Sequence, residues 1–101
     1  MTKEEIADLL EVTQVNDKVR PSLIRVMCKR DITHYGYFVS FDDYTELKAK
    51  NLFRFVLRNN FRIFNTDYQK SGKYNTRYSI ILNGDDVLYI EFVMPLTSSV
   101  F

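Results

Sequence analysis

Period-two alternation at both ends of the chain limits its fold more than any other feature. Residues 23–30 set one row of side chains against another: Leu23, Arg25, Met27 and Lys29 against Ile24, Val26, Cys28 and Arg30. Residues 34–41, 78–82 and 87–93 are three further runs rich in aromatic and β-branched residues. Such runs predict β-strands, so the chain is expected to be mainly β.

Glycine and turn residues indicate how these strands are connected. Gly36 interrupts the run 34–41, and an isolated glycine in a strand often marks a bulge or a strong bend. Sharply bent strands are what a small closed barrel needs. Residues 31–33 are expected to form a tight connection. The sequence Asn83-Gly84-Asp85-Asp86 predicts a turn, and Asn-Gly favours a hairpin because both residues tolerate positive φ.

A short helix is predicted before the strands, over residues 2–12. Thr2 followed by Glu5 is a capping-box pattern, in which each side chain satisfies a free backbone N–H of the first turn. Ile6, Leu9 and Leu10 make one apolar stripe. Because so short a helix is marginal alone, the stripe is expected to dock on the rest of the chain.

The middle of the chain fits more than one template. Residues 45–51 are compatible with a strand or a helix. Residues 52–64 fit a hairpin with its turn at Asn59-Asn60, and they also fit a helix on which Arg54, Arg58 and Arg62 recur every four residues. Aromatic and β-branched enrichment favours the hairpin. Residues 65–76 are expected to be a long loop or the tip of a long hairpin.

Composition narrows the possible functions. The 101 residues allow one compact domain over 1–101, and they include one cysteine and one histidine. Cys28 and His34 could pair as nucleophile and base, but nothing nearby provides an orienting third group. We therefore expect no enzyme, no catalytic residue, no metal site and no cofactor. The carboxylate pairs are interpreted as solvated turn residues rather than ligands of a divalent ion: Asp42/Asp43 and Asp85/Asp86.

The expected location is intracellular, either nuclear or cytoplasmic. No apolar run approaches the roughly 20 residues that a membrane helix needs. The first residues also lack the basic-then-apolar layout of a secretion signal, and a single thiol fits a reducing compartment. No membrane partner is expected.

Charge is distributed unevenly along the chain. Residues 50–78 hold seven basic residues against one acid, Asp67, a net charge of +6 that leaves −5 for the rest of a chain whose total is +1. Seven aromatic residues lie in the same segment. Basic side chains interleaved with aromatics suit a surface that tracks phosphates and stacks bases. The same pattern also describes an amphipathic strand, or an arm steered toward the acidic body of a neighbouring copy.

Two segments resemble the motifs of the Sm and Sm-like (LSm) family. Gly36, Ser40, Phe41, Asp42 and Tyr44 fall at the offsets of the first Sm motif, and residues 81–90 are similar to the second. The resemblance implies a short N-terminal helix followed by a small, strongly bent, five-stranded barrel of the SH3-like or Sm-like type. The domain then divides into a first motif region (23–49), a basic aromatic insertion (50–78) between strands 3 and 4, and a second motif region (78–93).

The resemblance also implies a uridine pocket, which this sequence alters. The family's base-stacking aromatic corresponds to Tyr44, its asparagine to Glu46, and its usual arginine to Asn83, which precedes Gly84. A carboxylate only accepts hydrogen bonds, so Glu46 cannot donate to uracil O4. Asn83 lacks the guanidinium plane and its charge.

The expected function follows from this resemblance. It is an Sm-like RNA-binding subunit of an oligomeric ribonucleoprotein ring that pairs strand edges with other Sm-like subunits or with itself. Single-stranded RNA is expected at Tyr44, Glu46, Asn83, Gly84, Arg54, Arg58 and Arg62, and the subunit interface at Val87, Tyr89 and Phe92. The alternatives are a non-enzymatic Sm-fold scaffold or assembly factor acting through protein contacts, and a small β-rich regulator from a mobile element.

Overall fold

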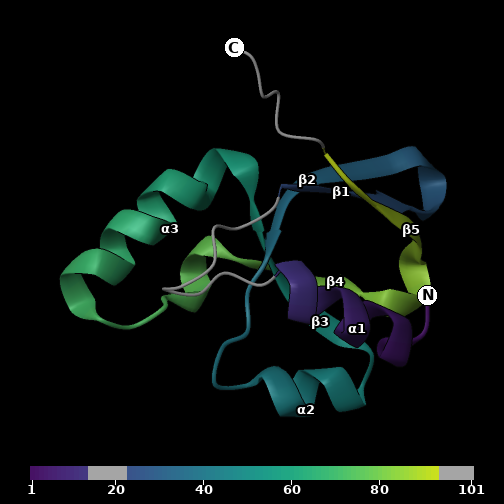
Figure 1. Cartoon of the computed structure of the whole chain (residues 1–101), viewed down its shortest axis with the longest axis horizontal. Helices are drawn as coiled ribbons and strands as arrows, with labels where there is room; N and C mark the ends of the chain where they lie inside the picture. Colours follow the sequence, from purple (N-terminus) through teal and green to yellow (C-terminus); the bar gives the residue numbers. More distant parts are fainter. Residues whose placement is uncertain (14–22, 94–101) are drawn as a thin grey trace.

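A five-stranded antiparallel sheet forms the centre of the computed structural model, which describes residues 1–13 and 23–93, with no side chains described for 11–13 (Figure 1). The strands are β1 (Ile24–Cys28), β2 (Ile32–Phe38), β3 (Leu52–Leu57), β4 (Ile80–Asn83) and β5 (Val87–Phe92). The helices are α1 (Lys3–Thr13), α2 (Tyr44–Ala49) and α3 (Arg58–Ser71). Three one-turn 3-10 segments complete the described elements: η1 (Lys29–Asp31) joins β1 to β2, η2 (Thr76–Tyr78) lies between α3 and β4, and η3 (Gly84–Asp86) joins β4 to β5.

The sheet is open, with the strand order β4-β3-β2-β1-β5. The expectation of a mainly β chain with a short N-terminal helix is confirmed, but the expected closed barrel is not formed. The hairpin expected at Asn83-Gly84 is also wrong, because β4 pairs with β3 and β5 pairs with β1. Instead of a two-residue turn with positive φ, η3 carries the chain from one edge strand to the other, and the Asn83 side chain accepts from the Asp85 N–H at 3.0 Å.

The β1–β2 hairpin turns earlier than expected. Cys28 pairs with Ile32, so residues 32 and 33 already belong to β2. The turn is η1, in which Arg30 and Asp31 have φ of 65° and 60°. On its other side, β1 pairs with β5, where Arg25 lies opposite Glu91 and forms an ion pair with it at 2.5 Å.

Gly36 is required by the close approach of β2 to β3. It pairs in register with Ile24 on one side and Leu57 on the other, so it does not form a bulge. A Cβ at this position would collide with the backbone carbonyl of Val56 and press into the ring of Phe55. Only glycine therefore fits here without moving β3.

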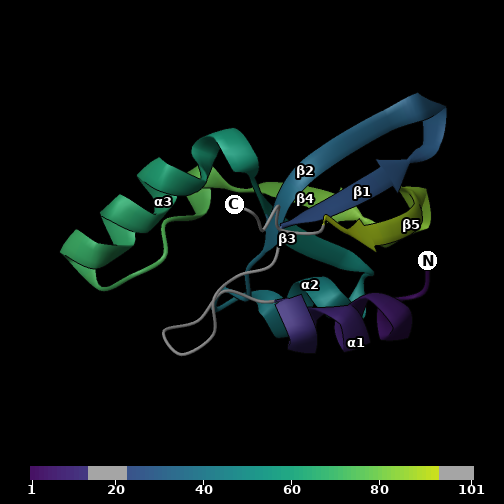
Figure 2. The same ribbon diagram turned by 45° about the horizontal axis from the view of Figure 1, so that its top comes forward.

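Helices α1 and α2 lie side by side against one face of the sheet (Figure 2). The capping box is confirmed: the Thr2 N–H donates to Glu5 Oε1 at 2.9 Å, and the Glu5 N–H donates to Thr2 Oγ1 at 3.2 Å. Ile6 and Leu10 from the predicted stripe are 1% and 2% exposed. They join a core whose other members are Ile24, Val26, Cys28, Phe38, Phe53, Phe55, Leu82 and Val87.

The middle of the chain is part strand and part helix. Residues 45–49 belong to α2 and residues 52–57 to β3, but the hairpin with its turn at Asn59-Asn60 is wrong because both residues lie in the first turn of α3. Residues 65–71, expected in a loop, continue this helix until Gly72, whose φ of 75° ends it. Phe61 and Phe64 pack α3 on a second core of Val39, Phe41 and Val56.

No helix among the described residues has both the length and the apolar character needed to cross a membrane.

Candidate functional site

The expected base-stacking residue, Tyr44, is part of the packing. It is the first residue of α2, it is half-buried, and it lies against the first core with its ring centroid 6.5 Å from that of Phe53. Glu46, two residues later, is exposed to solvent. The aromatic ring that the resemblance assigns to a nucleobase therefore already packs on a phenylalanine.

Asn51 joins the two motif regions, and sequence reasoning missed it. It follows α2 with φ of 59°, and its Nδ2 donates to the backbone oxygen of Met1 at 3.2 Å and to Asp85 Oδ1 at 3.0 Å. Its backbone oxygen accepts from the Gly84 N–H at 2.7 Å. Gly84 is buried, and a Cβ there would collide with the Asn51 amide. The Asn-Gly pair of the second motif is thus held by its backbone against the end of α2.

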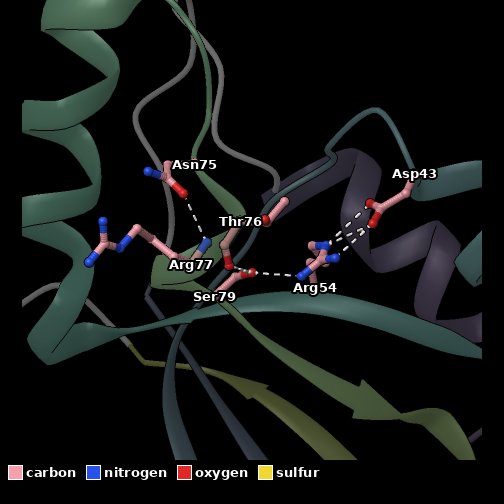
Figure 3. A network of polar contacts seen from close by, with 6 residues as sticks. All are labelled: Asp43, Arg54, Asn75, Thr76, Arg77 and Ser79. Carbon is pink, nitrogen blue, oxygen red and sulfur yellow. Dashed lines mark hydrogen bonds and ion pairs between the residues drawn. The ribbon is translucent and has the colours of Figure 1, made fainter.

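The Arg54 side chain forms hydrogen bonds within the chain rather than facing solvent (Figure 3). Its Nη2 and Nε donate to Asp43 Oδ2 at 2.7 and 3.0 Å, and its Nη1 donates to Ser79 Oγ at 3.1 Å. The guanidinium also lies 5.5 Å from the centroid of the Phe41 ring. The Arg54 guanidinium lowers the pKa of the Asp43 carboxyl below its ordinary value of 3.8. Arg54 therefore ties the loop before α2 to the start of β4.

Arg58 and Arg62 differ from Arg54 because both are exposed on α3. The Arg58 guanidinium lies 5.4 Å from the centroid of the Tyr35 ring on β2, a cation–π distance. Three more exposed cations follow in the same part of the chain: Lys70, Lys73 and Arg77.

Below α3, four aromatic rings form a stack. The ring centroids of Tyr68 and Tyr74 are 4.3 Å apart. The rings of Phe41, Phe64 and Tyr74 are nearly parallel, with centroids 5.2 to 6.0 Å from one another. A hollow of about 530 Å³ opens beside it, bordered by Asp42, Asp43, Lys73 and Thr76. The stack fixes the end of α3 against the loop that precedes α2.

The two edge strands present apolar side chains. On β5, Leu88, Tyr89 and Phe92 are 56%, 44% and 46% exposed, and on β4 Ile81 is 47% exposed. Of the three expected interface residues, Tyr89 and Phe92 thus face outward, whereas Val87 is 2% exposed and belongs to the core. Leu88 and Ile81 take its place as outward-facing edge residues.

Cys28 and His34 both border a second hollow of about 510 Å³, together with Asp86. Burial and the nearby Asp86 carboxylate raise the pKa of the Cys28 thiol. A raised pKa disfavours the thiolate, which is the nucleophilic form. Among the described residues, no group of three histidine, cysteine or carboxylate side chains is arranged to hold a metal ion.

The described residues therefore offer surfaces for binding: two apolar strand edges, a row of exposed cations on α3, and the junction of α2 with η3. No family model, no curated protein sequence and no solved structure matches the chain.

Proposed function

We propose that the chain is a non-enzymatic, Sm-like subunit of an oligomeric ribonucleoprotein ring that binds single-stranded RNA. One observation carries the assembly part of this proposal: β4 and β5 are the two opposite edges of the same sheet. A strand edge presents unpaired backbone groups to any strand that can extend the sheet. Head-to-tail pairing of one copy's β4 with the next copy's β5 repeats indefinitely or closes into a ring.

The element order supports the Sm-like part of the proposal. A capped helix precedes five antiparallel strands, and the second motif region supplies both edge strands. The resemblance implies pairing of the last strand with a neighbour's fourth strand, and among residues 1–13 and 23–93 these are the two edge strands of the sheet. Apolar edge residues on both strands suit such a contact: Ile81, Leu88, Tyr89 and Phe92.

Cross-linking between edges tests the assembly. A chain carrying Ile81→Cys is mixed with a chain carrying Leu88→Cys under mild oxidation, where the native Cys28 is buried and slow to react. We expect a cross-linked dimer, because paired edges bring the two thiols within disulfide distance. The matched control replaces Leu88→Cys with Ile63→Cys, which is equally exposed but lies on α3. Equal yields in both mixtures, or none in either, would contradict edge pairing.

A scaffold or assembly factor that binds no RNA is the second candidate. Two observations favour it: Tyr44 packs against Phe53, and the exposed carboxylate of Glu46 stands where the resemblance requires an amide. Both candidates use the strand edges, so RNA affinity separates them. Fluorescence anisotropy with a labelled single-stranded RNA, repeated at several salt concentrations, is the direct measurement. A cross-linked assembly without RNA affinity would select the scaffold.

A further inference from the structure

The outer face of α3 carries a row of cations. Arg58 and Arg62 are one turn apart, and Lys70 lies about two turns further along, rotated by roughly 80° from Arg62 around the helix axis. All three are exposed. The opposite side of the helix, through Phe61 and Phe64, is the one packed on the second core. From residue 58 to residue 70 the helix rises roughly 18 Å. Figure 1 shows α3 standing out to one side of the sheet.

Within the described part of the chain, none of these cations forms an ion pair. Asp67, the only acid in residues 50–78, is half-buried, whereas the three cations are exposed. The ion pairs found among the described residues join Arg25 to Glu91 and Arg54 to Asp43, and so involve none of the three. The face between them is amide-rich, with exposed side chains that both donate and accept hydrogen bonds: Asn59, Asn65 and Gln69.

This arrangement opposes the stability of the helix itself. Arg58 lies in the first turn, where the helix dipole disfavours a cation, and it is followed one turn later by the like charge of Arg62. Helix α1 shows the favourable arrangement, with Glu4 and Glu5 in its first turn. Departures from local stability rules of this kind are expected at functional surfaces.

We infer that the outer face of α3, through Arg58, Arg62 and Lys70, binds the phosphate backbone of single-stranded RNA. The inference rests on the proposed function for the nature of the ligand, and it moves the main contact away from Tyr44 and Asn83, the positions that the resemblance assigns to base contacts. Cations spaced along the exposed side of one helix suit a repeating chain of phosphates. The partly exposed ring of Tyr35, held under Arg58, adds an aromatic surface next to that row, a combination that single-strand binders use.

The test replaces all three cations with glutamine (R58Q/R62Q/K70Q) and measures affinity for a mixed-sequence RNA of about 16 nucleotides by anisotropy. The control variant K3Q/K29Q/K50Q removes the same charge from three exposed lysines outside α3. We expect the α3 variant to lose at least about tenfold in affinity, and its salt slope to fall by about 2, at roughly 0.7 per phosphate contact on a single strand. The control is expected to keep most of its affinity and slope.

Three results would overturn the inference. They are equal losses in the two variants, an unchanged affinity in the α3 variant, and binding of polyglutamate by the native chain as tight as that of RNA. The last would assign the face to acidic protein partners. Edge cross-linking keeps this test separate from that of the proposed function. If the α3 variant loses RNA binding but still forms the edge cross-link, both the α3 inference and the proposed assembly are supported. If no cross-link forms but RNA binding depends on the α3 cations, only the proposed ring is rejected.

Discussion

Arg54 on β3 donates hydrogen bonds to Asp43, eleven residues earlier, through two nitrogens: Nη2 lies 2.7 Å and Nε 3.0 Å from Oδ2. The pair closes the loop before α2 over the second core, where the same guanidinium covers the Phe41 ring. Asp43 therefore helps to hold this loop in place, and the charge of Arg54 is neutralised within the chain by the ion pair.

The Asp43 ion pair predicts acid sensitivity. Because Arg54 lowers the pKa of Asp43 in the folded state, the folded chain binds this proton less tightly than the unfolded chain does. The contribution of the pair to stability is complete above the ordinary pKa of 3.8 and is lost as the pH falls below it toward the lowered value. Thermal unfolding measured from neutral pH downward should show a steeper loss in the native chain than in Asp43→Asn. Parallel curves would contradict this role.

Gly36→Ala should destabilise the fold by about 2–3 kcal/mol or more, since a Cβ would drive into the β3 backbone, which cannot move as a side chain can. Gly72→Ala is the matched control. Gly72 has open space around it, so its replacement costs only the strain of a positive φ, about 1 kcal/mol. Urea unfolding of the two variants checks the order, and a larger loss at residue 72 would be inconsistent with this account of Gly36.

Asn51 is expected to stabilise the junction of α2 with η3 in two separable ways. Asn51→Ala removes the hydrogen bonds to Met1 and Asp85 and also strains the left-handed backbone. Asn51→Gly removes the same bonds but relieves the strain. Chemical denaturation should therefore place the glycine variant about 1 kcal/mol above the alanine variant, with both below the native chain. If the two variants are equally stable, the backbone conformation at residue 51 is not the one described.

Glu46→Asn should change base preference if RNA also reaches α2. An amide offers uracil one donor and one acceptor, whereas the native carboxylate only accepts and suits the amino group of cytosine. We expect the variant to shift preference from oligocytidine toward oligouridine by about 1 kcal/mol. Glu4→Asn, an equal charge change on exposed α1, is the control. Unchanged preference in both would place all base contacts outside this pocket.

Local signals in the sequence predicted local structure well. The Thr2–Glu5 capping box and the alternating strands 24–28 and 87–92 depend on neighbouring residues, and the structure contains them. Residues 52–64 carried two periodicities at once, and the chain uses each in turn: a strand through Leu57, then a helix whose Phe61 and Phe64 meet the second core. Packing against that core decides which periodicity the chain adopts, and residues of that core lie outside the segment 52–64 in the sequence.

The roles of the candidate site residues also depend on contacts between residues that are distant in the sequence. Arg54, Arg58 and Arg62 look alike in the sequence, but only the fold brings Asp43 and Ser79 to Arg54 and leaves the other two exposed. Asn83-Gly84 favoured a hairpin, yet the choice of partner strand is made by the whole sheet. Asn51 carried no recognisable motif, and the signal of its role in the sequence was its residue type, because asparagine tolerates positive φ better than most residues.

The three residues of η3 also limit how far apart the two edge strands can lie at one end of the sheet. Asn83 at the end of β4 and Val87 at the start of β5 are four residue steps apart, so the two edges lie within about 14 Å of each other there, although they do not pair. At the other end, β4 begins next to η2 and α3, while β5 ends beside the start of β1. In a flat five-stranded sheet the edge strands would lie about 19 Å apart, so the sheet is curled at its η3 end. A copy paired with β4 and a copy paired with β5 would therefore approach each other most closely beside η3.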